Sequence, residues 1–186
     1  MKMRIISGDL KRRLIKVPES KEIRPMTDRV RETLFNLLTN KIDFTGIKVL
    51  DLYSGSGALG LECISRGAAE AHFVERNFSI YKNLQENIDL LGVKDKCMIF
   101  KMEAVKFSEM KDHDQYDLIL ADPPFFKDDV YKAAENLIKN NFLKRNALIF
   151  IERSIQTKDK DITNFRVEPF RTIGDACIYE IKGAVA

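Results

Sequence analysis

The amino-acid sequence predicts an α/β fold, a doubly wound and mostly parallel sheet of seven strands. From residue 47 onward, short apolar runs alternate with segments whose apolar residues recur at helical spacing. Such alternation is typical of right-handed βαβ units and hence of a parallel sheet covered by helices. Near the C-terminus two β-like runs follow one another with no helical segment between them. We therefore expect an antiparallel C-terminal hairpin at one edge of the sheet.

The first forty residues are expected to form a small N-terminal β-hairpin and helix. Residues 3–17 contain two β-prone runs around the pair Gly8-Asp9, which predicts the hairpin. A helix is expected over roughly 28–39, with Thr27 or Asp28 as its N-cap. We accordingly divide the chain into two parts, a basic extension over 1–40 and a main domain over 41–186.

The elements of the main domain follow from apolar runs and helical periodicity. We expect strands near 47–52, 70–75, 97–101, 116–121 and 146–152. We expect helices near 57–66, 77–91, 103–110 and 129–140. The runs of the C-terminal hairpin are 165–171 and 177–181, joined around Gly174-Asp175.

A glycine-rich turn follows the first strand of the sheet. Gly55, Gly57 and Gly60 form the pattern G-x-G-x-x-G between an apolar run and a helical segment. Glycines permit a tight turn and let a ligand approach the backbone closely. Glu75 stands at the end of the next strand, where a carboxylate can accept hydrogen bonds from both hydroxyls of a ribose. These residues predict a cofactor that contains a nucleoside.

Asp51 indicates which cofactor this is. It stands at the end of the strand, four residues before Gly55, so its carboxylate would repel the pyrophosphate of a nicotinamide dinucleotide. The same carboxylate suits the amino group and the sulfonium of S-adenosyl-L-methionine. The alternative is that Asp51 and Ser54 only shape the turn.

A second motif, Asp122-Pro123-Pro124-Phe125, follows the strand near 116–121. Because ligands bind beyond the carboxyl ends of the strands, this motif should face the glycine turn. The prolines leave bare carbonyl acceptors, so a carboxylate and a carbonyl can hold the two hydrogens of an exocyclic amino group. Phe125 can stack on a planar base. The motif favours methylation of a nucleobase amino group, and the alternative is a stiff loop with an N-capping Asp.

Composition and charge restrict the class of protein. With 186 residues, 45% hydrophobic and 32% charged, the chain reads as a globular protein of one main domain, and no apolar run approaches a membrane span. The cysteines are scattered and the two histidines lie far apart, so we expect reduced thiols, no metal and a cytoplasmic location. Residues 1–31 hold ten Lys and Arg against four Asp and Glu, a net charge of +6 in a chain of +3. That segment suggests a polyanionic partner, although an ordinary solvated surface is the alternative.

These motifs together resemble class I S-adenosylmethionine-dependent methyltransferases, whose domain is Rossmann-like. More narrowly the chain resembles the RsmD family, which methylates the N2 of a guanine in bacterial small-subunit (16S) ribosomal RNA. The resemblance extends over nearly the full length, and its most specific part is the segment I-R-P-M-T-D-R-V-R-E at 23–32. It departs from the family pattern at Met26, Glu103 and Phe126, where Thr, Asp or Asn, and a polar residue are commoner.

The resemblance and the motifs assign roles to individual residues. Catalysis is expected from Asp122, Pro123, Pro124 and Phe125. Cofactor binding is expected from Asp51, Tyr53, Ser54, Gly55, Gly57, Gly60, Glu75, Arg76, Glu103 and Ala104. RNA phosphates are expected to meet Lys11, Arg12, Arg13, Arg24, Arg29 and Arg31. The expected partner is ribosomal RNA in a small-subunit or assembly particle, bound by a monomer.

Three other functions remain open on the sequence alone. A DNA adenine-N6 methyltransferase uses a similar D-P-P-[YF] motif, but no added DNA-recognition domain is evident in this short chain. A non-catalytic RNA-binding factor would not need the intact motif at Asp122. A nicotinamide-dependent oxidoreductase is disfavoured by Asp51 and by the lack of an evident proton donor.

Overall fold

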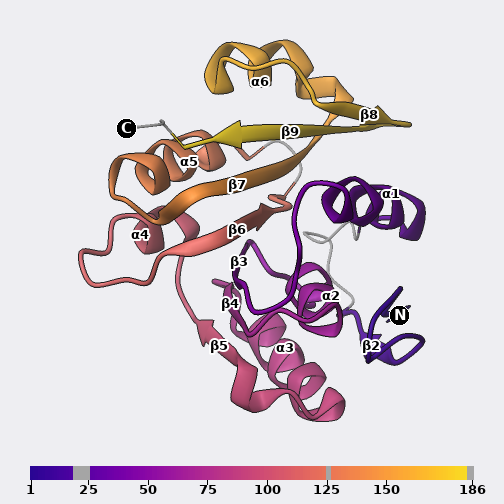
Figure 1. Ribbon diagram of the computed structural model, residues 1–186. Helices are drawn as coiled ribbons and strands as arrows, with labels where there is room; N and C mark the ends of the chain where they lie inside the picture. The colour runs from indigo at the N-terminus through magenta and orange to yellow at the C-terminus, as the bar shows by residue number, and fades with distance from the viewer. Residues whose placement is uncertain (19–25, 125–126, 184–186) are drawn as a thin grey trace.

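The structure, a computed structural model, describes residues 1–18, 26–124 and 127–183 (Figure 1). Its main body is a seven-stranded sheet in the order β5-β4-β3-β6-β7-β9-β8. The parallel strands are β3 (Lys48–Leu52), β4 (Glu70–Val74), β5 (Cys97–Phe100), β6 (Tyr116–Ala121) and β7 (Leu143–Ser154). The antiparallel strands are β9 (Ala176–Lys182) and β8 (Arg171–Ile173). The predicted fold class is confirmed, including the hairpin at one edge.

Helices cover both faces of this sheet. They are α1 (Asp28–Thr39), α2 (Ala58–Ser65), α3 (Phe78–Leu91), α4 (Ala104–Ser108), α5 (Asp129–Lys139) and α6 (Lys158–Phe165). Alternate residues of β6 show the two layers, since Leu118 and Leu120 pack with α1, α2 and α3, whereas Ile119 and Ala121 pack with α4 and α5. Strands buried on both faces read as continuous apolar runs, which is why the sequence shows them so clearly. Among the described helices, none has the length and apolarity to cross a membrane.

The strand order reverses at β3, which lies between β4 and β6. The chain leaves β3 toward β4 and β5 on one side and returns to β6 and β7 on the other. Open α/β sheets bind ligands at the carboxyl ends of the strands beside such a reversal. The topology therefore places the ends of β3, β4 and β6 together as the expected binding edge.

The C-terminal third differs from the expectation in one element. The run expected as a strand over 165–171 begins with the last residue of α6, and only Arg171–Ile173 forms β8. The helix α6 was not predicted because its residues are mostly polar and give little apolar periodicity. Its buried contact is made by Asp161, which pairs with Arg153 of β7. A polar tertiary contact of this kind leaves no hydrophobic pattern in the sequence.

The extension forms the predicted hairpin, β1 (Lys2–Arg4) paired with β2 (Leu14–Lys16), outside the main sheet. Glu62 of α2 holds it, because its carboxylate accepts the Ile6 N–H at 2.7 Å and the Ser7 N–H at 3.0 Å. Asn87 of α3 holds the other strand, accepting from the Lys16 N–H and donating to the Lys16 carbonyl. Apolar residues of the hairpin and α1 belong to the same core as α2, α3 and the sheet. The extension is therefore packed onto the main domain through buried polar and apolar contacts.

Glu62→Gln should destabilise the protein, because the carboxylate also accepts from Arg66 and an amide cannot satisfy all three donors. We expect the free energy of unfolding in urea to fall by about 1–3 kcal/mol, the cost of an unsatisfied buried hydrogen bond. The control is Glu86→Gln, which removes an exposed ion pair to Lys16 of the same hairpin and should change stability little. Equal effects of the two substitutions would contradict this account of how the extension is held.

Candidate active site

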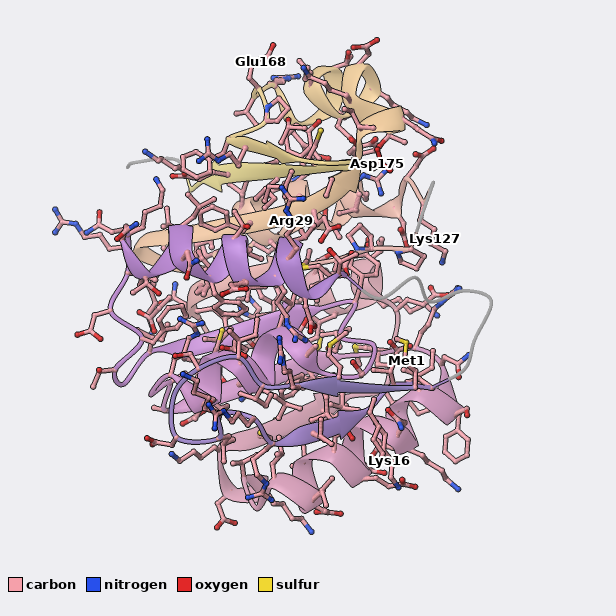
Figure 2. The ribbon with its side chains drawn as sticks, turned by 90° about the vertical axis from the view of Figure 1, so that its right-hand side faces the viewer. Met1, Lys16, Arg29, Lys127, Glu168 and Asp175 are labelled. Atoms are coloured by element: carbon pink, nitrogen blue, oxygen red, sulfur yellow. The ribbon has the colours of Figure 1, made fainter. Side chains whose placement is uncertain are left out.

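Side chains at the carboxyl ends of β3, β4, β6 and β7 line one cavity of about 430 Å³. The extension reaches its rim through Met3 and Arg29, and the β8–β9 turn reaches it through Gly174 and Asp175. Figure 2 faces this side of the molecule, where Arg29, Lys127 and Asp175 lie around one region of the surface. The cavity thus lies at the edge that the strand order marks.

The structure brings most of the expected site residues to this cavity. Its lining includes Asp51, Tyr53, Ser54, Gly55, Glu75, Arg76, Glu103, Ala104, Asp122, Pro123 and Pro124. Gly57 and Gly60 lie behind the lining, in the turn and in α2. Phe125 falls outside the described residues. The two motifs, which are about seventy residues apart in the sequence, therefore face each other as expected.

The glycine turn has a defined backbone. Tyr53, Gly55 and Gly57 have φ of +66°, +54° and +82°, a region that favours glycine at the latter two positions. The Ser54 hydroxyl donates to the Asp51 carbonyl at 2.6 Å, and the Ser54 N–H donates to the carbonyl of Val74 in β4. The turn is thus tied to both strands. Burial and the neighbouring Asp129 carboxylate raise the pKa of Tyr53.

Asp51 is 1% exposed, and its carboxylate accepts the Gly60 N–H at 2.9 Å. Gly60 cannot carry a side chain, because a Cβ there would lie 2.4 Å from the ring of Phe73 and 3.2 Å from the Cβ of Asp51. The third glycine of the motif therefore allows α2 to pack closely on β3 and β4. Burial raises the pKa of Asp51 well above its usual range against the Gly60 hydrogen bond, and the charges of Asp122 and Glu75 add to this rise.

Glu75 joins the end of β4 to the glycine turn. Its carboxylate accepts the Asn77 N–H at 2.7 Å and the Gly55 N–H at 3.1 Å, with 8% of the residue exposed. Burial raises the pKa of Glu75, while these two backbone hydrogen bonds act in the opposite direction. Next to it Arg76 is exposed, and on the same side of the cavity Glu103 is exposed while Ala104 is buried at the start of α4.

Asp122 follows the last residue of β6 and is partly buried in the cavity wall. Burial raises the pKa of Asp122 to about 7, although the positive charge of Arg153 acts against the rise. A carboxylate that is held beside two prolines and titrates near neutral pH can accept hydrogen bonds from a ligand that displaces its water. This is the arrangement expected of a group that orients an amine.

Arg153 is a site residue that the sequence analysis missed. It lies at the end of β7, lines the cavity and is 4% exposed. Its Nε donates to the Asp161 carboxylate at 3.0 Å, and that carboxylate also accepts from the hydroxyls of Tyr131 and Thr157. This network fixes a positive charge near Asp122. The signal available in the sequence was a charged pair, Glu152-Arg153, directly after a buried apolar run.

The structure corrects the expectation for Arg31. Its side chain is fully buried, donating to the Arg4 carbonyl at 2.6 Å and to the Asp28 carboxylate at 3.0 Å, and it contacts the sulfur of Met3. Burial lowers the pKa of Arg31, while the charge of Asp28 raises it. This guanidinium ties α1 to β1. It belongs to the lining of the active-site cavity but is not exposed on the outer surface, where RNA phosphates would lie.

The other basic residues expected at the RNA lie in different places. Arg29 lines the rim of the cavity, whereas Arg24 lies outside the described residues. Lys11, Arg12 and Arg13 lie in the connection of the hairpin, and Arg13 donates to the Leu90 carbonyl in the last turn of α3. Arg13 is thus held at the far end of α3, and none of these three residues lines the cavity.

Comparison with known proteins is consistent with the site. Residues 3–182 match the model of the family described as "Conserved hypothetical protein 95". The chain is 36% identical over 154 residues to "Ribosomal RNA small subunit methyltransferase D" of Escherichia coli strain K12, covering 83% of this chain and 76% of that protein. It is 31% identical over 188 residues to "Putative rRNA methyltransferase YlbH" of Bacillus subtilis, covering 97% and 100%.

Solved structures show the same fold over almost the whole chain. "Putative methyltransferase yhhF from Escherichia coli" superposes with a TM-score of 0.83 at 29% identity, covering 98% of each chain. A putative methylase from Haemophilus influenzae superposes with a TM-score of 0.74 at 26% identity, covering 98% of this chain and 99% of the other. The chain therefore belongs to the Conserved hypothetical protein 95 family, the RsmD family that its sequence motifs resemble.

Proposed function

We propose that this protein transfers a methyl group from S-adenosyl-L-methionine to the exocyclic N2 amino group of a guanine in bacterial 16S ribosomal RNA. The observation that carries the proposal is the position of Asp122 and Pro123, which share one cavity with the glycine turn at the reversal of the sheet. The names of the relatives support ribosomal RNA of the small subunit as the substrate. The choice of guanine N2 rests on the resemblance of the motifs to the RsmD family.

The residues around the cavity fit this cofactor. Asp51, Glu75 and Asp122 are carboxylates whose pKa is raised at one edge of the sheet, so a ligand that brings positive charge relieves their repulsion. Asp51 and the glycine turn would hold the methionine part, Glu75 the ribose hydroxyls, and Glu103 with Ala104 the adenine side. S-adenosylmethionine, when bound there, supplies a methyl group activated by its sulfonium.

The protein's own contribution to the reaction is orientation of the base. The target guanine must leave the helical stack, since its N2 is not accessible while the base is paired and stacked. The Asp122 carboxylate and the Pro123 carbonyl accept hydrogen bonds from the two N2 hydrogens and thereby direct its lone pair. The proton that N2 loses on taking the methyl group would pass to the Asp122 carboxylate, with S-adenosylhomocysteine as the other product. That lone pair is delocalised into the ring and is a poor nucleophile, so alignment supplies much of the acceleration.

We assign RNA contacts to two parts of the extension, the start of α1 and the connection of the hairpin. Arg29 lies at the cavity rim, so it would contact phosphates next to the flipped nucleotide. Lys11, Arg12 and Arg13 lie outside the cavity lining and would contact another part of the RNA. We propose that residues 1–40 serve RNA binding and residues 41–186 serve methyl transfer, in a cytoplasmic monomer that acts on a small-subunit or assembly particle.

Asp122→Ala should abolish methyl transfer while leaving the affinity for S-adenosylhomocysteine nearly unchanged, because that ligand lacks the sulfonium charge and most of the proposed cofactor contacts come from β3, β4 and α4. The assay is single-turnover transfer of a labelled methyl group to unmodified small-subunit rRNA or particles, followed by identification of the methylated nucleoside. Wild type should form N2-methylguanosine, and misalignment should slow the variant about a hundredfold or more. Asp122→Asn should be less impaired, since its amide keeps one acceptor.

This assay also separates the alternatives. N6-methyladenosine as product, with DNA as the better substrate, would show the DNA adenine-N6 reaction instead. Near-normal turnover by a folded Asp122→Ala protein would remove Asp122 from the mechanism. RNA binding without any transfer by wild type would identify a binding factor.

The reaction should also depend on pH through Asp122. Its ionised form is the acceptor, and its pKa is raised to about 7, so the rate constant at subsaturating cofactor should rise with pH and level off above roughly pH 7. Asp122→Asn should lose this inflection, whatever its residual rate. A wild-type profile that is flat between pH 5.5 and 8.5 would contradict the assignment.

Thermal melts provide the matching control for folding. An unfolded Asp titrates near pH 4, so the native state binds the extra proton between about pH 4 and 7. The contribution of Asp122 to stability is therefore greatest at low pH and is lost as the pH rises through 7. Asp122→Asn should melt at least as high as wild type at pH 8, which would show that lost activity is not lost structure.

A further inference from the structure

An exposed aromatic side chain with two ammonium groups over its ring stands beside the active site. Phe78, the first residue of α3, is 52% exposed. The Nζ atoms of Lys82 and Lys101 lie 4.6 Å and 4.8 Å from the centroid of its ring. The ring of Tyr81 lies nearly parallel to that of Phe78, with an interplanar angle of 11° and centroids 6.4 Å apart. We refer to Phe78, Tyr81, Lys82 and Lys101 as the Phe78 platform.

The platform borders a second cavity, which adjoins the active-site cavity. The second cavity has a volume of about 510 Å³ and is lined by Arg76, Asn77, Lys101, Met102, Glu103 and Lys106. Lys101 belongs to both the platform and this lining. Arg76, Met102 and Glu103 also line the active-site cavity, so the two cavities share a wall. Among the described residues of this lining, three cationic side chains stand against one carboxylate, which makes the second cavity positive.

We propose that the Phe78 platform and the second cavity bind single-stranded RNA next to the target nucleotide, with a base stacked on Phe78 and phosphates at Lys101 and Lys106. The proposal rests on the proposed function, because that function requires an RNA whose target base has left the stack. Flipping one nucleotide leaves its neighbours partly unstacked, and an aromatic face can receive one of them.

The chemistry of the surface favours RNA over a protein partner. Proteins that bind single strands combine aromatic faces with a positively charged path for the backbone, and both features are present here. An ammonium group over an exposed ring is held only weakly, so Lys82 and Lys101 can move to phosphates when a base replaces them. The surface also lies at the same edge as Asp122, unlike Lys11, Arg12 and Arg13.

A single substitution makes this surface observable. The chain contains no tryptophan, so Phe78→Trp introduces one reporter whose fluorescence is quenched when a base stacks on it. We expect quenching on addition of a 20-nucleotide single-stranded RNA of mixed sequence. The matched control is Phe170→Trp, since Phe170 is 40% exposed, has the Nζ of Lys41 4.4 Å from its ring centroid and lines neither cavity. The control should not be quenched.

Affinity measurements complete the test. Phe78→Ala should weaken binding of the same RNA about tenfold, whereas Phe78→Tyr should keep it. Lys101→Ala should lower the slope of log affinity against log salt by about 0.7, the value for one phosphate contact on a single strand. The affinity for S-adenosylmethionine should not change in any of these variants.

Two results would overturn the proposal. One is an unquenched Phe78→Trp protein together with wild-type RNA affinity in Phe78→Ala. The other is quenching by isolated small-subunit proteins and not by RNA, which would show a protein partner. Failure of the proposed function is a separate result, because these readouts measure RNA binding and need no methyl transfer.

Discussion

Three carboxylates at one edge of the sheet are the constraint on which the rest of the site depends. Asp51, Glu75 and Asp122 stand at the ends of β3, β4 and β6, and burial raises the pKa of each. Buried carboxylates are unfavourable unless hydrogen bonds or opposite charges compensate them. Backbone N–H groups of Gly60, Gly55 and Asn77 provide this for the first two, and Arg153 provides charge for the third. The positive charge of Arg153 balances only part of the negative charge at this edge, so the edge is preorganised to bind a cationic ligand.

The fold could be predicted where burial in the tertiary structure requires a recognisable pattern of apolar residues in the sequence. Strands covered on both faces appear as apolar runs, and α3 appears as a stripe of Ile80, Leu84 and Ile88, all of which are buried. The helix α6 has no such pattern, since Asp161 anchors it through hydrogen bonds to Arg153, Tyr131 and Thr157. Asp161 is its one fully buried residue and Phe165 adds contacts to the rings of Tyr131 and Tyr179, so the segment has the polar composition of a loop. The same network positions Arg153 against Asp122, so the unpredicted helix supports the site.

The residues of the candidate site could likewise be predicted only in part. The position of motifs that directly follow strands could be predicted, because parallel strands bring their carboxyl ends to one edge of the sheet. The described residues expected at the site within Asp51–Glu75 and Asp122–Pro124 line one cavity there, except Gly57 and Gly60. The positions of residues that were singled out only by their positive charge could not be predicted. Arg31 is buried against Asp28, and Lys11, Arg12 and Arg13 lie near the far end of α3, because a basic composition carries no information about direction. Nothing in the sequence distinguishes Phe78 from its helical neighbours, since its exposure depends on what packs beside it.

The most direct test of this account is the number of protons released when the cofactor binds. Calorimetry at pH 7 in buffers of different ionisation enthalpy gives that number for S-adenosylmethionine and for S-adenosylhomocysteine, which lacks the sulfonium charge. Because the pKa of Asp122 is raised to about 7, the sulfonium should drive its ionisation, so S-adenosylmethionine should release more protons. The difference between the two ligands should disappear in Asp122→Asn. Equal proton release by both ligands in the wild-type protein would contradict the claim that these carboxylates form a site for the charged methyl donor.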